Sequence, residues 1–167
     1  KIYYEDSLPY AAEFFAGLGD SQVFSHKDIN AELVADADVL LVRSTTKVNA
    51  ALLDANKAIK YVGTATAGTN HLDKAYLQSR GLAVHSAAGC NAVAVAEYVL
   101  SALFVMAEKL DWQLTDKTVG IVGAGHVGTR LSEKLTALGI QYYLCDPPLA
   151  DAGDSRDFVT MDTIMQC

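Results

Sequence analysis

Three glycines and one acid make up the pattern in this chain that is best suited to bind a phosphorylated ligand. Gly123, Gly125 and Gly128 have the spacing Gly-x-Gly-x-x-Gly, and Asp146 stands 18 residues after the last of them. In such a motif the first glycine permits a tight turn, the second lets backbone amides approach a pyrophosphate, and the third lets a helix pack against a strand. The acid accepts hydrogen bonds from ribose hydroxyls. The pattern therefore predicts a site for a ligand that carries a diphosphate and a ribose.

The segments on either side of the glycines make this prediction more specific than the motif alone. Residues 118–122 are apolar and β-branched, which is typical of a buried parallel strand. Leucines follow at helical spacing until Gly139, and residues 142–145 are predicted to form a second strand that ends at Asp146. A glycine turn between a strand and a helix, followed by an acid, indicates a dinucleotide-binding unit. The alternative is an ordinary strand–helix–strand unit with a glycine turn.

The residues predicted to hold the cofactor are Gly123, Gly125, His126, Val127, Gly128 and Asp146. For His126 the backbone N–H is the expected contact, because amides at the start of a helix face the phosphates. The Asp146 carboxylate would repel a 2′-phosphate by about 4 kcal/mol at ~4 Å and an effective dielectric of ~20. Pro147 and Pro148 follow it, and no arginine stands there to accept such a phosphate. The sequence therefore predicts NAD rather than NADP.

Short apolar strands alternate with helical segments along the first half of the chain. We expect strands at residues 2–4, 22–24, 39–42, 61–63 and 82–84, and helices at residues 8–15, 30–35, 49–53 and 72–80. Strands that alternate with helices form a parallel sheet with right-handed crossovers. The predicted fold class is α/β, with a flavodoxin-like parallel-sheet domain followed by the first part of a Rossmann domain.

A long apolar helix is expected between these two parts, at residues 91–110. It is hydrophobic nearly all round, so we expect it to be buried on most faces, as a hinge helix between domains or as a dimer face. Glu97 in its middle argues against a membrane span, because a carboxylate there is costly. A structural hydrogen bond to Glu97 is expected instead.

Composition excludes several classes of function. Hydrophobic residues make up 51% of the chain, charged residues 20%, and the net charge is −7, which favours a soluble globular protein and argues against nucleic acid or a membrane surface as a partner. The cysteines, Cys90, Cys145 and Cys167, are widely spaced and odd in number. This fits reduced thiols in the cytoplasm and no metal site.

Four further segments carry a resemblance to a known family. They are residues 42–49 (VRSTTKVN), 63–71 (GTATAGTNH), 88–92 (AGCNA) and 145–148 (CDPP). With the glycine motif and the order of elements, they make the chain similar to the D-2-hydroxyacid dehydrogenases along its whole length. The resemblance implies an oxidoreductase that uses NAD on a small phosphorylated hydroxy acid and forms a homodimer.

The same resemblance sets the expected domains. Residues 1–90 are expected to form the substrate-binding domain, residues 91–112 the hinge helix, and residues 113–167 a partial NAD-binding domain with two of six strands. The family uses a histidine base, a glutamate that orients it and an arginine that holds the substrate, all beyond the position of Cys167. We therefore predict no catalytic residue within this chain and expect the chain alone to be inactive.

Ser44 and Thr66 are the predicted substrate-binding residues. Each follows an expected strand, and ligands of open α/β sheets bind at the carboxyl ends of strands. Small residues around Thr66 leave amides free for a carboxylate, although a simple tight loop is the alternative. Arg43 and Lys47 stand close to Ser44 and could meet a phosphate, but surface charge is the simpler interpretation. His71 follows these small residues and could help to shape the loop, but we expect a role at the start of a helix.

Two other interpretations remain open at this point. The first is another 2-hydroxyacid dehydrogenase, of the phosphoglycerate or glyoxylate type, which would differ only in its substrate. The second is a non-catalytic module that binds NAD with the same fold. The sequence that follows Cys167 would separate an enzyme from a module.

Overall fold

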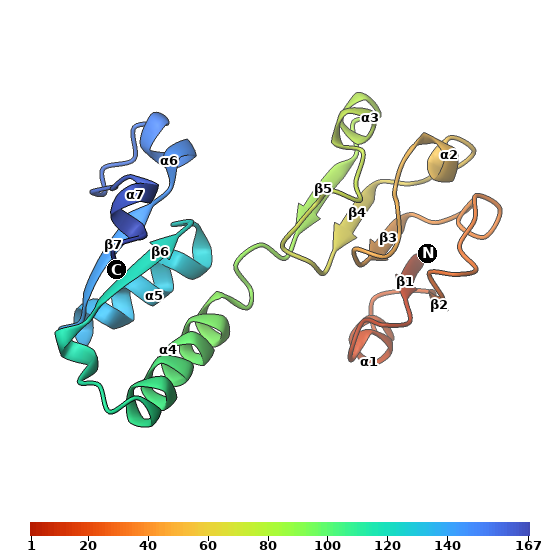
Figure 1. The fold of residues 1–167 in the computed structure, drawn as a ribbon. Coiled ribbons are helices and arrows are strands. Elements are labelled where there is room, and N and C mark those ends of the chain that lie inside the picture. The colour runs from red at the N-terminus through yellow and green to blue at the C-terminus, as the bar shows by residue number, and fades with distance from the viewer. The chain divides into compact units, whose positions relative to one another are not determined.

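The structure, a computed structural model, describes residues 1–167 and contains two compact units. The first unit is Lys1–Ala88 and the second is Gly89–Cys167 (Figure 1). No helix in either unit is long and apolar enough to span a membrane. Each unit is an α/β arrangement with its own hydrophobic core.

A five-stranded sheet forms the centre of the first unit. Its strands are β1 (Ile2–Glu5), β2 (Ser21–Phe24), β3 (Val39–Val42), β4 (Tyr61–Thr64) and β5 (Ala83–Ser86). All neighbouring strands are parallel, and their order is β2-β1-β3-β4-β5. This is the order of flavodoxin-like sheets, in which ligands bind beyond the carboxyl ends of the strands. The predicted fold class is confirmed.

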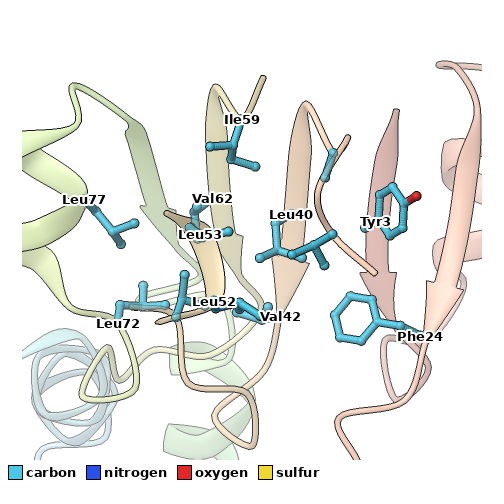
Figure 2. Packing of buried hydrophobic residues seen from close by; sticks show 13 residues of the cluster. Tyr3, Phe24, Leu40, Val42, Leu52, Leu53, Ile59, Val62, Leu72 and Leu77 are labelled. Atoms are coloured by element: carbon cyan, nitrogen blue, oxygen red, sulfur yellow. The ribbon is translucent and has the colours of Figure 1, made fainter. Parts of the chain in front are cut away.

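Helices α2 (Ala50–Leu53) and α3 (Lys74–Ser79) contribute to the main core of this unit. Side chains alternate between the faces of a strand, so Leu40, Val42 and Val62 share one face. Figure 2 shows these side chains packed with Leu52, Leu53 and Leu77 of the two helices. Burial of large aliphatic side chains, at about 25 cal/mol per Å², is the main force that fixes this sheet.

The opposite face of the same sheet is less covered. Helix α1 (Ala11–Phe15) is short, and the chain around it borders a hollow of about 440 Å³. Leu41, Gly63 and His85 line this hollow from the strands, and Phe14 from α1. The two faces of the sheet therefore differ: one is a packed core and the other is open.

The second unit has a two-stranded parallel sheet of β6 (Thr118–Val122) and β7 (Gln141–Cys145). Helix α5 (His126–Ala137) connects the strands and packs against α4 (Ala92–Lys109). Their shared core includes Ala96, Ile121, Leu131, Leu135 and Leu144. The short helix α7 (Met161–Ile164) contacts both strands. A 3₁₀ turn at Leu114–Asp116 leads into β6.

Within the second unit α4 packs along one side only, so its burial on most faces, as a hinge helix or a dimer face, stays a prediction. Only Ala92, Ala96 and Ala107 are buried in it, whereas Tyr98 is 75% exposed and Met106 is 51% exposed. One stripe of the helix packs on α5, and the rest of the second unit leaves the other apolar side chains of α4 uncovered. Glu97 does have a partner, since its carboxylate accepts a 3.0 Å bond from Lys134 of α5.

Two expectations differ from the structure. No helix forms at residues 30–35, because residues 31–36 form turns instead. After β7, a helix that was not predicted, α6 (Pro147–Asp151), begins at once. Its signal is present in the sequence, because an acid at the N-cap followed by proline at the first helical position favours a helix start.

Candidate functional site

The glycine turn of the second unit needs each of its glycines for a different reason. Gly123 has φ of +92°, a conformation that other residues rarely adopt. A Cβ atom on Gly128 would lie 2.1 Å from the carbonyl oxygen of Gly123, so no side chain fits there. A Cβ on Gly125 would meet nothing within 4 Å. The first and third glycines therefore shape the turn, and the second faces open space.

Helix α5 begins directly at this turn, with Gly125 as its N-cap residue. The amides of Gly125, His126 and Val127 donate to no protein group, as is usual in the first turn of a helix. Such amides and the helix dipole favour an anion. The ring of His126 packs next to Gly89. The backbone amide of His126, and not its ring, is therefore the group available to an anion at the glycine turn.

Asp146 joins the turn to the end of β7. Its Oδ2 accepts the Ala124 amide at 2.8 Å, and its Oδ1 accepts the Leu149 amide at 3.2 Å as the N-cap of α6. A carboxylate has about four acceptor positions, so two bonds leave capacity for a diol. The structure thus holds the carboxylate next to the glycine turn in a fixed orientation.

Arg156 is the residue near this turn that the sequence did not reveal. Its Nη1 donates to the Ala124 carbonyl and to the Thr129 hydroxyl, both at 2.9 Å. Its Nε and Nη2 each donate a 2.8 Å hydrogen bond to the Asp154 carboxylate. These bonds lower the pKa of Asp154 to about 2. No arginine directly follows Asp146 in the sequence, but Arg156 lies near Asp146 in space. This arginine is already paired, and no spacing rule relates it to the motif.

A hollow of about 320 Å³ lies beside the turn. Its lining includes Gly125, His126, Leu149 and Arg156. A diphosphate would find free amides on one side of this hollow, whereas the arginine on another side is already paired with Asp154. The six residues predicted to bind the cofactor therefore lie in one continuous region of the second unit.

Ser44 and Thr66 are brought to the same edge of the first sheet. Val42 pairs with Thr64 in the β3–β4 register, and the two predicted residues each follow two positions later. Parallel strands end at one edge, so both residues lie there. The Ser44 side chain is exposed and makes no hydrogen bond within the chain. The amides of residues 66–69 also donate to no protein group, which leaves them available to an anion.

Glu5 fixes the loop that carries Ser44. This glutamate is fully buried at the end of β1. Its Oε1 accepts from the hydroxyls of Ser7 at 2.8 Å and Thr45 at 2.6 Å. Its Oε2 accepts from the Arg43 amide at 2.9 Å and the Thr46 hydroxyl at 2.8 Å. The buried carboxylate thus has four donors, three of them from the loop around Ser44.

The electrostatics of Glu5 follow from this arrangement. Burial raises the pKa of its carboxyl, but the hydrogen bonds outweigh burial and hold the pKa below its ordinary value. Glu5 is therefore ionised at neutral pH. Asp6 and His26 place ligand atoms within 4.8 Å of it and of each other, a spacing that could suit a metal ion. Because both Glu5 oxygens already accept two bonds, this group is a poor fit to a cation.

His71 has a different role from the one expected. The N-cap of α3 is Asp73, whose side chain accepts the Tyr76 amide at 3.0 Å. The His71 ring instead lies 2.9 Å from the Thr64 hydroxyl, which in turn lies 2.9 Å from the Thr66 hydroxyl. Burial lowers the pKa of His71, although the Glu5 charge opposes this effect. Tertiary packing thus directs the ring to the sheet edge that carries Thr66 rather than to the helix start.

Arg43 and Lys47 remain at the rim of this edge. The Arg43 guanidinium is 3.5 Å from the Ser7 carbonyl, and Lys47 is exposed without an ionic partner. Neither cation forms an ion pair within the chain. Both interpretations therefore stay open: these residues are surface charges, or they contact a phosphate.

A parallel sheet of flavodoxin order, and a glycine turn between a strand and a helix, define a doubly wound α/β protein of the kind that binds nucleotides. The family described as D-isomer specific 2-hydroxyacid dehydrogenase, catalytic domain, matches residues 4–166. The chain belongs to this family.

Particular relatives narrow the comparison. The chain is 90% identical to erythronate-4-phosphate dehydrogenase of Pseudoalteromonas atlantica over 167 residues, which is all of this chain and 45% of the relative. It therefore spans less than half of the length of that curated relative.

Solved structures share the fold. A D-lactate dehydrogenase from Aquifex aeolicus, solved with NAD and lactic acid, has a TM-score of 0.70 at 17% identity, covering 99% of this chain and 54% of that one. An NAD-bound 3-phosphoglycerate dehydrogenase of Entamoeba histolytica has a TM-score of 0.64 at 25% identity, covering 87% and 54%.

Proposed function

We propose that this chain is the N-terminal part of an NAD-dependent dehydrogenase that oxidises 4-phospho-D-erythronate in pyridoxine biosynthesis. The product is 2-oxo-3-hydroxy-4-phosphobutanoate. The observation that carries the proposal is the 90% identity to an erythronate-4-phosphate dehydrogenase over the whole chain. The glycine turn and the carboxylate beside it support the cofactor, since their geometry suits a diphosphate and a ribose.

NAD, when bound, accepts the hydride that leaves C2 of the substrate. The chain's own residues would hold the cofactor. Amides of Gly125, His126 and Val127 would bind the diphosphate, and the open space at Gly125 would let it approach. Asp146 would accept hydrogen bonds from the ribose hydroxyls and disfavour a 2′-phosphate.

The carboxyl edge of the first sheet would hold the substrate. Ser44 would donate its free hydroxyl to a substrate oxygen, and Thr66 with the amides after it would bind the carboxylate. Arg43 and Lys47 are the cations of this rim that could meet the phosphate. The base, its orienting glutamate and the substrate-binding arginine of the family would come from sequence that follows Cys167.

We also propose a cellular compartment and an oligomeric state for the protein. Reduced cysteines and the absence of a Cys/His cluster in the sequence fit the cytoplasm. The apolar side chains exposed on α4 support a homodimer that would cover them. The net charge of −7 argues against nucleic acid or an anionic membrane as a partner.

The test uses the full-length protein that contains this chain. We expect NADH formation from NAD and 4-phospho-D-erythronate, with a kcat/KM at least tenfold above that for 3-phosphoglycerate or glycolate. Ser44→Ala and Thr66→Val should raise the KM for the hydroxy acid and leave the KM for NAD unchanged. Asp146→Ala should weaken NAD binding, whereas Asp116→Ala, an exposed position at the opposite end of β6 from the glycine turn, should not. No NADH from 4-phospho-D-erythronate would refute the substrate, and undiminished NAD binding in Asp146→Ala would refute the cofactor site.

A further inference from the structure

Three side chains at the substrate edge form a hydrogen-bonded row whose direction can be worked out by counting hydrogen atoms. The row runs from His71 Nε2 to the Thr64 hydroxyl, then to the Thr66 hydroxyl and then to the Gly68 carbonyl oxygen. The successive distances are 2.9, 2.9 and 2.8 Å. Each hydroxyl has a single hydrogen atom to donate, and a carbonyl oxygen can only accept.

The count starts at the fixed end. Because Gly68 can only accept, the Thr66 hydroxyl uses its hydrogen there. The bond between the two threonines must then come from Thr64, which spends its own hydrogen on Thr66. Thr64 has none left for the ring, so His71 Nε2 must carry a hydrogen and donate to Thr64. All three bonds exist together only if His71 is protonated on Nε2.

The other neutral tautomer of His71 would give a different edge. With the hydrogen on Nδ1, Nε2 would accept from Thr64, and Thr66 would lose the bond that it receives. Thr66 could then satisfy either Thr64 or Gly68 but not both. In either arrangement the Thr66 hydroxyl receives no hydrogen bond from Thr64, so it is a weaker donor toward an anion. The tautomer of His71 thus decides whether the Thr66 hydroxyl receives a hydrogen bond from Thr64.

The surroundings of the row suit an anionic oxygen as its final acceptor. Gly68 is exposed, so water can replace Thr66 at its carbonyl when Thr66 turns to a ligand. A carboxylate is a stronger acceptor than a neutral carbonyl, and a hydroxyl that itself receives a hydrogen bond is a stronger donor. The free amides of residues 66–69 would bind the same carboxylate.

We propose that His71 is a positioning residue for substrate binding: through Thr64, its Nε2–H makes the Thr66 hydroxyl a donor toward the substrate carboxylate. This inference rests on the proposed function for the identity of the ligand. The direction of the row does not depend on it. His71 touches neither substrate nor cofactor in this proposal and acts only through Thr64.

The first test measures the row without any activity. Histidine labelled with ¹⁵N in the full-length protein allows the protonated ring nitrogen of each histidine to be identified by NMR. We expect His71 to be the Nε2–H tautomer, and Thr64→Val to shift the His71 ring signals while those of His85, an exposed histidine, stay in place. An Nδ1–H tautomer in the unsubstituted chain would overturn the proposal.

The second test uses the kinetics of the full-length protein. His71→Phe should raise the KM for 4-phospho-D-erythronate about tenfold, as expected when one hydrogen bond to a charged group is weakened. The KM for NAD should not change, and kcat should change much less than KM. His71→Gln keeps an N–H donor and should recover most of the loss, and His85→Phe serves as the matched control. A structural role alone would not separate the two KM values.

A double variant completes the design. If the two residues act through one row, His71→Phe combined with Thr64→Val should be no worse than Thr64→Val alone. Additive effects, an equal rise in both KM values, or no effect of His71→Phe would overturn the proposal. If the full-length protein does not turn over 4-phospho-D-erythronate, the proposed function fails instead, and the NMR result still decides whether His71 sets the direction of Thr66.

Discussion

The two candidate binding edges of this protein are shaped in opposite ways. In the second unit, the turn at Gly123–Gly128 is defined by side chains that are missing, since a Cβ on Gly128 would collide with a carbonyl oxygen. In the first unit, the loops around Ser44 and Thr66 are defined by side chains that are present. Glu5 accepts three hydrogen bonds from the loop around Ser44, and the His71 ring contacts Thr64 beside the loop of Thr66. One edge offers backbone amides, and the other adds hydroxyls.

This difference affects what each edge can recognise and how each can fail. An edge made of amides binds any suitably shaped diphosphate and tolerates change in its neighbours, provided that the glycines remain. An edge held by a buried carboxylate and a histidine depends on groups that titrate and on partners that are distant in sequence. We therefore expect steric substitutions to damage the second unit most and loss of hydrogen bonds to damage the first.

The largest effect is expected for Gly128→Ala. The added Cβ would lie 2.1 Å from the Gly123 oxygen, so helix or turn must move, at a cost of about 3 kcal/mol. We expect this loss in urea unfolding followed by the fluorescence of Trp112, the single tryptophan, which lies in the second unit. NAD binding should be lost as well.

Gly125→Ala is the matched control for this substitution. Its Cβ meets nothing, so stability should change by less than ~0.5 kcal/mol, while NAD affinity should fall because the methyl group enters the ligand space. Wild-type stability and NAD binding in Gly128→Ala would contradict the steric origin of the turn.

The next effect is expected for Glu5→Gln. Each Glu5 oxygen accepts two bonds, and an amide NH₂ group in the place of one oxygen would face two donors. We expect a loss of about 3 kcal/mol in the first unit, measured by hydrogen exchange of the Arg43 amide. Glu13→Gln, on the exposed side of α1, should have no effect.

This substitution also carries a pH dependence. The folded pKa of Glu5 lies below its ordinary value, so its stabilising contribution is complete above the unfolded-state pKa of about 4.3 and is lost as pH falls through the folded pKa. The stability difference between wild type and Glu5→Gln should therefore be constant near neutral pH and shrink below about pH 4. A difference that grows on acidification would mean that Glu5 is protonated in the native state.

The smallest effect is expected for Arg156→Gln. This substitution tests whether a side chain, in addition to the glycines, shapes the candidate binding edge of the second unit. Without the guanidinium, the pKa of Asp154 should rise from about 2 toward its ordinary value, as followed by carboxyl ¹³C NMR titration. NAD affinity should change less than twofold, because the turn depends on its glycines. Arg130→Gln, which breaks a pair with Glu133, should leave the pKa of Asp154 unaltered. A large loss of NAD affinity in Arg156→Gln would remove the contrast between the two edges.

Much of the fold could be predicted because its signals are local. Alternating apolar strands and helices gave the parallel sheet, and the glycines at fixed spacing gave the turn. The helix at Pro147 was also present as a local signal but was not recognised. Which side of α4 packs on α5 could not be predicted, because an apolar helix carries no information about which of its sides finds a partner.

The sequence alone determined the elements and the backbone turn, since strand propensity, helix periodicity and glycine conformations depend on residues a few positions apart. Tertiary structure decided the polar contacts that complete both edges. Glu5 meets Thr46 across 41 positions, and Arg156 meets Ala124 across 32. Such partners are set by the order and register of strands, which bring the ends of β1, β3 and β4 to one edge. A hydrogen bond acts only over about 3 Å, so its partners are fixed by where folding places them and not by the residues beside them in the chain.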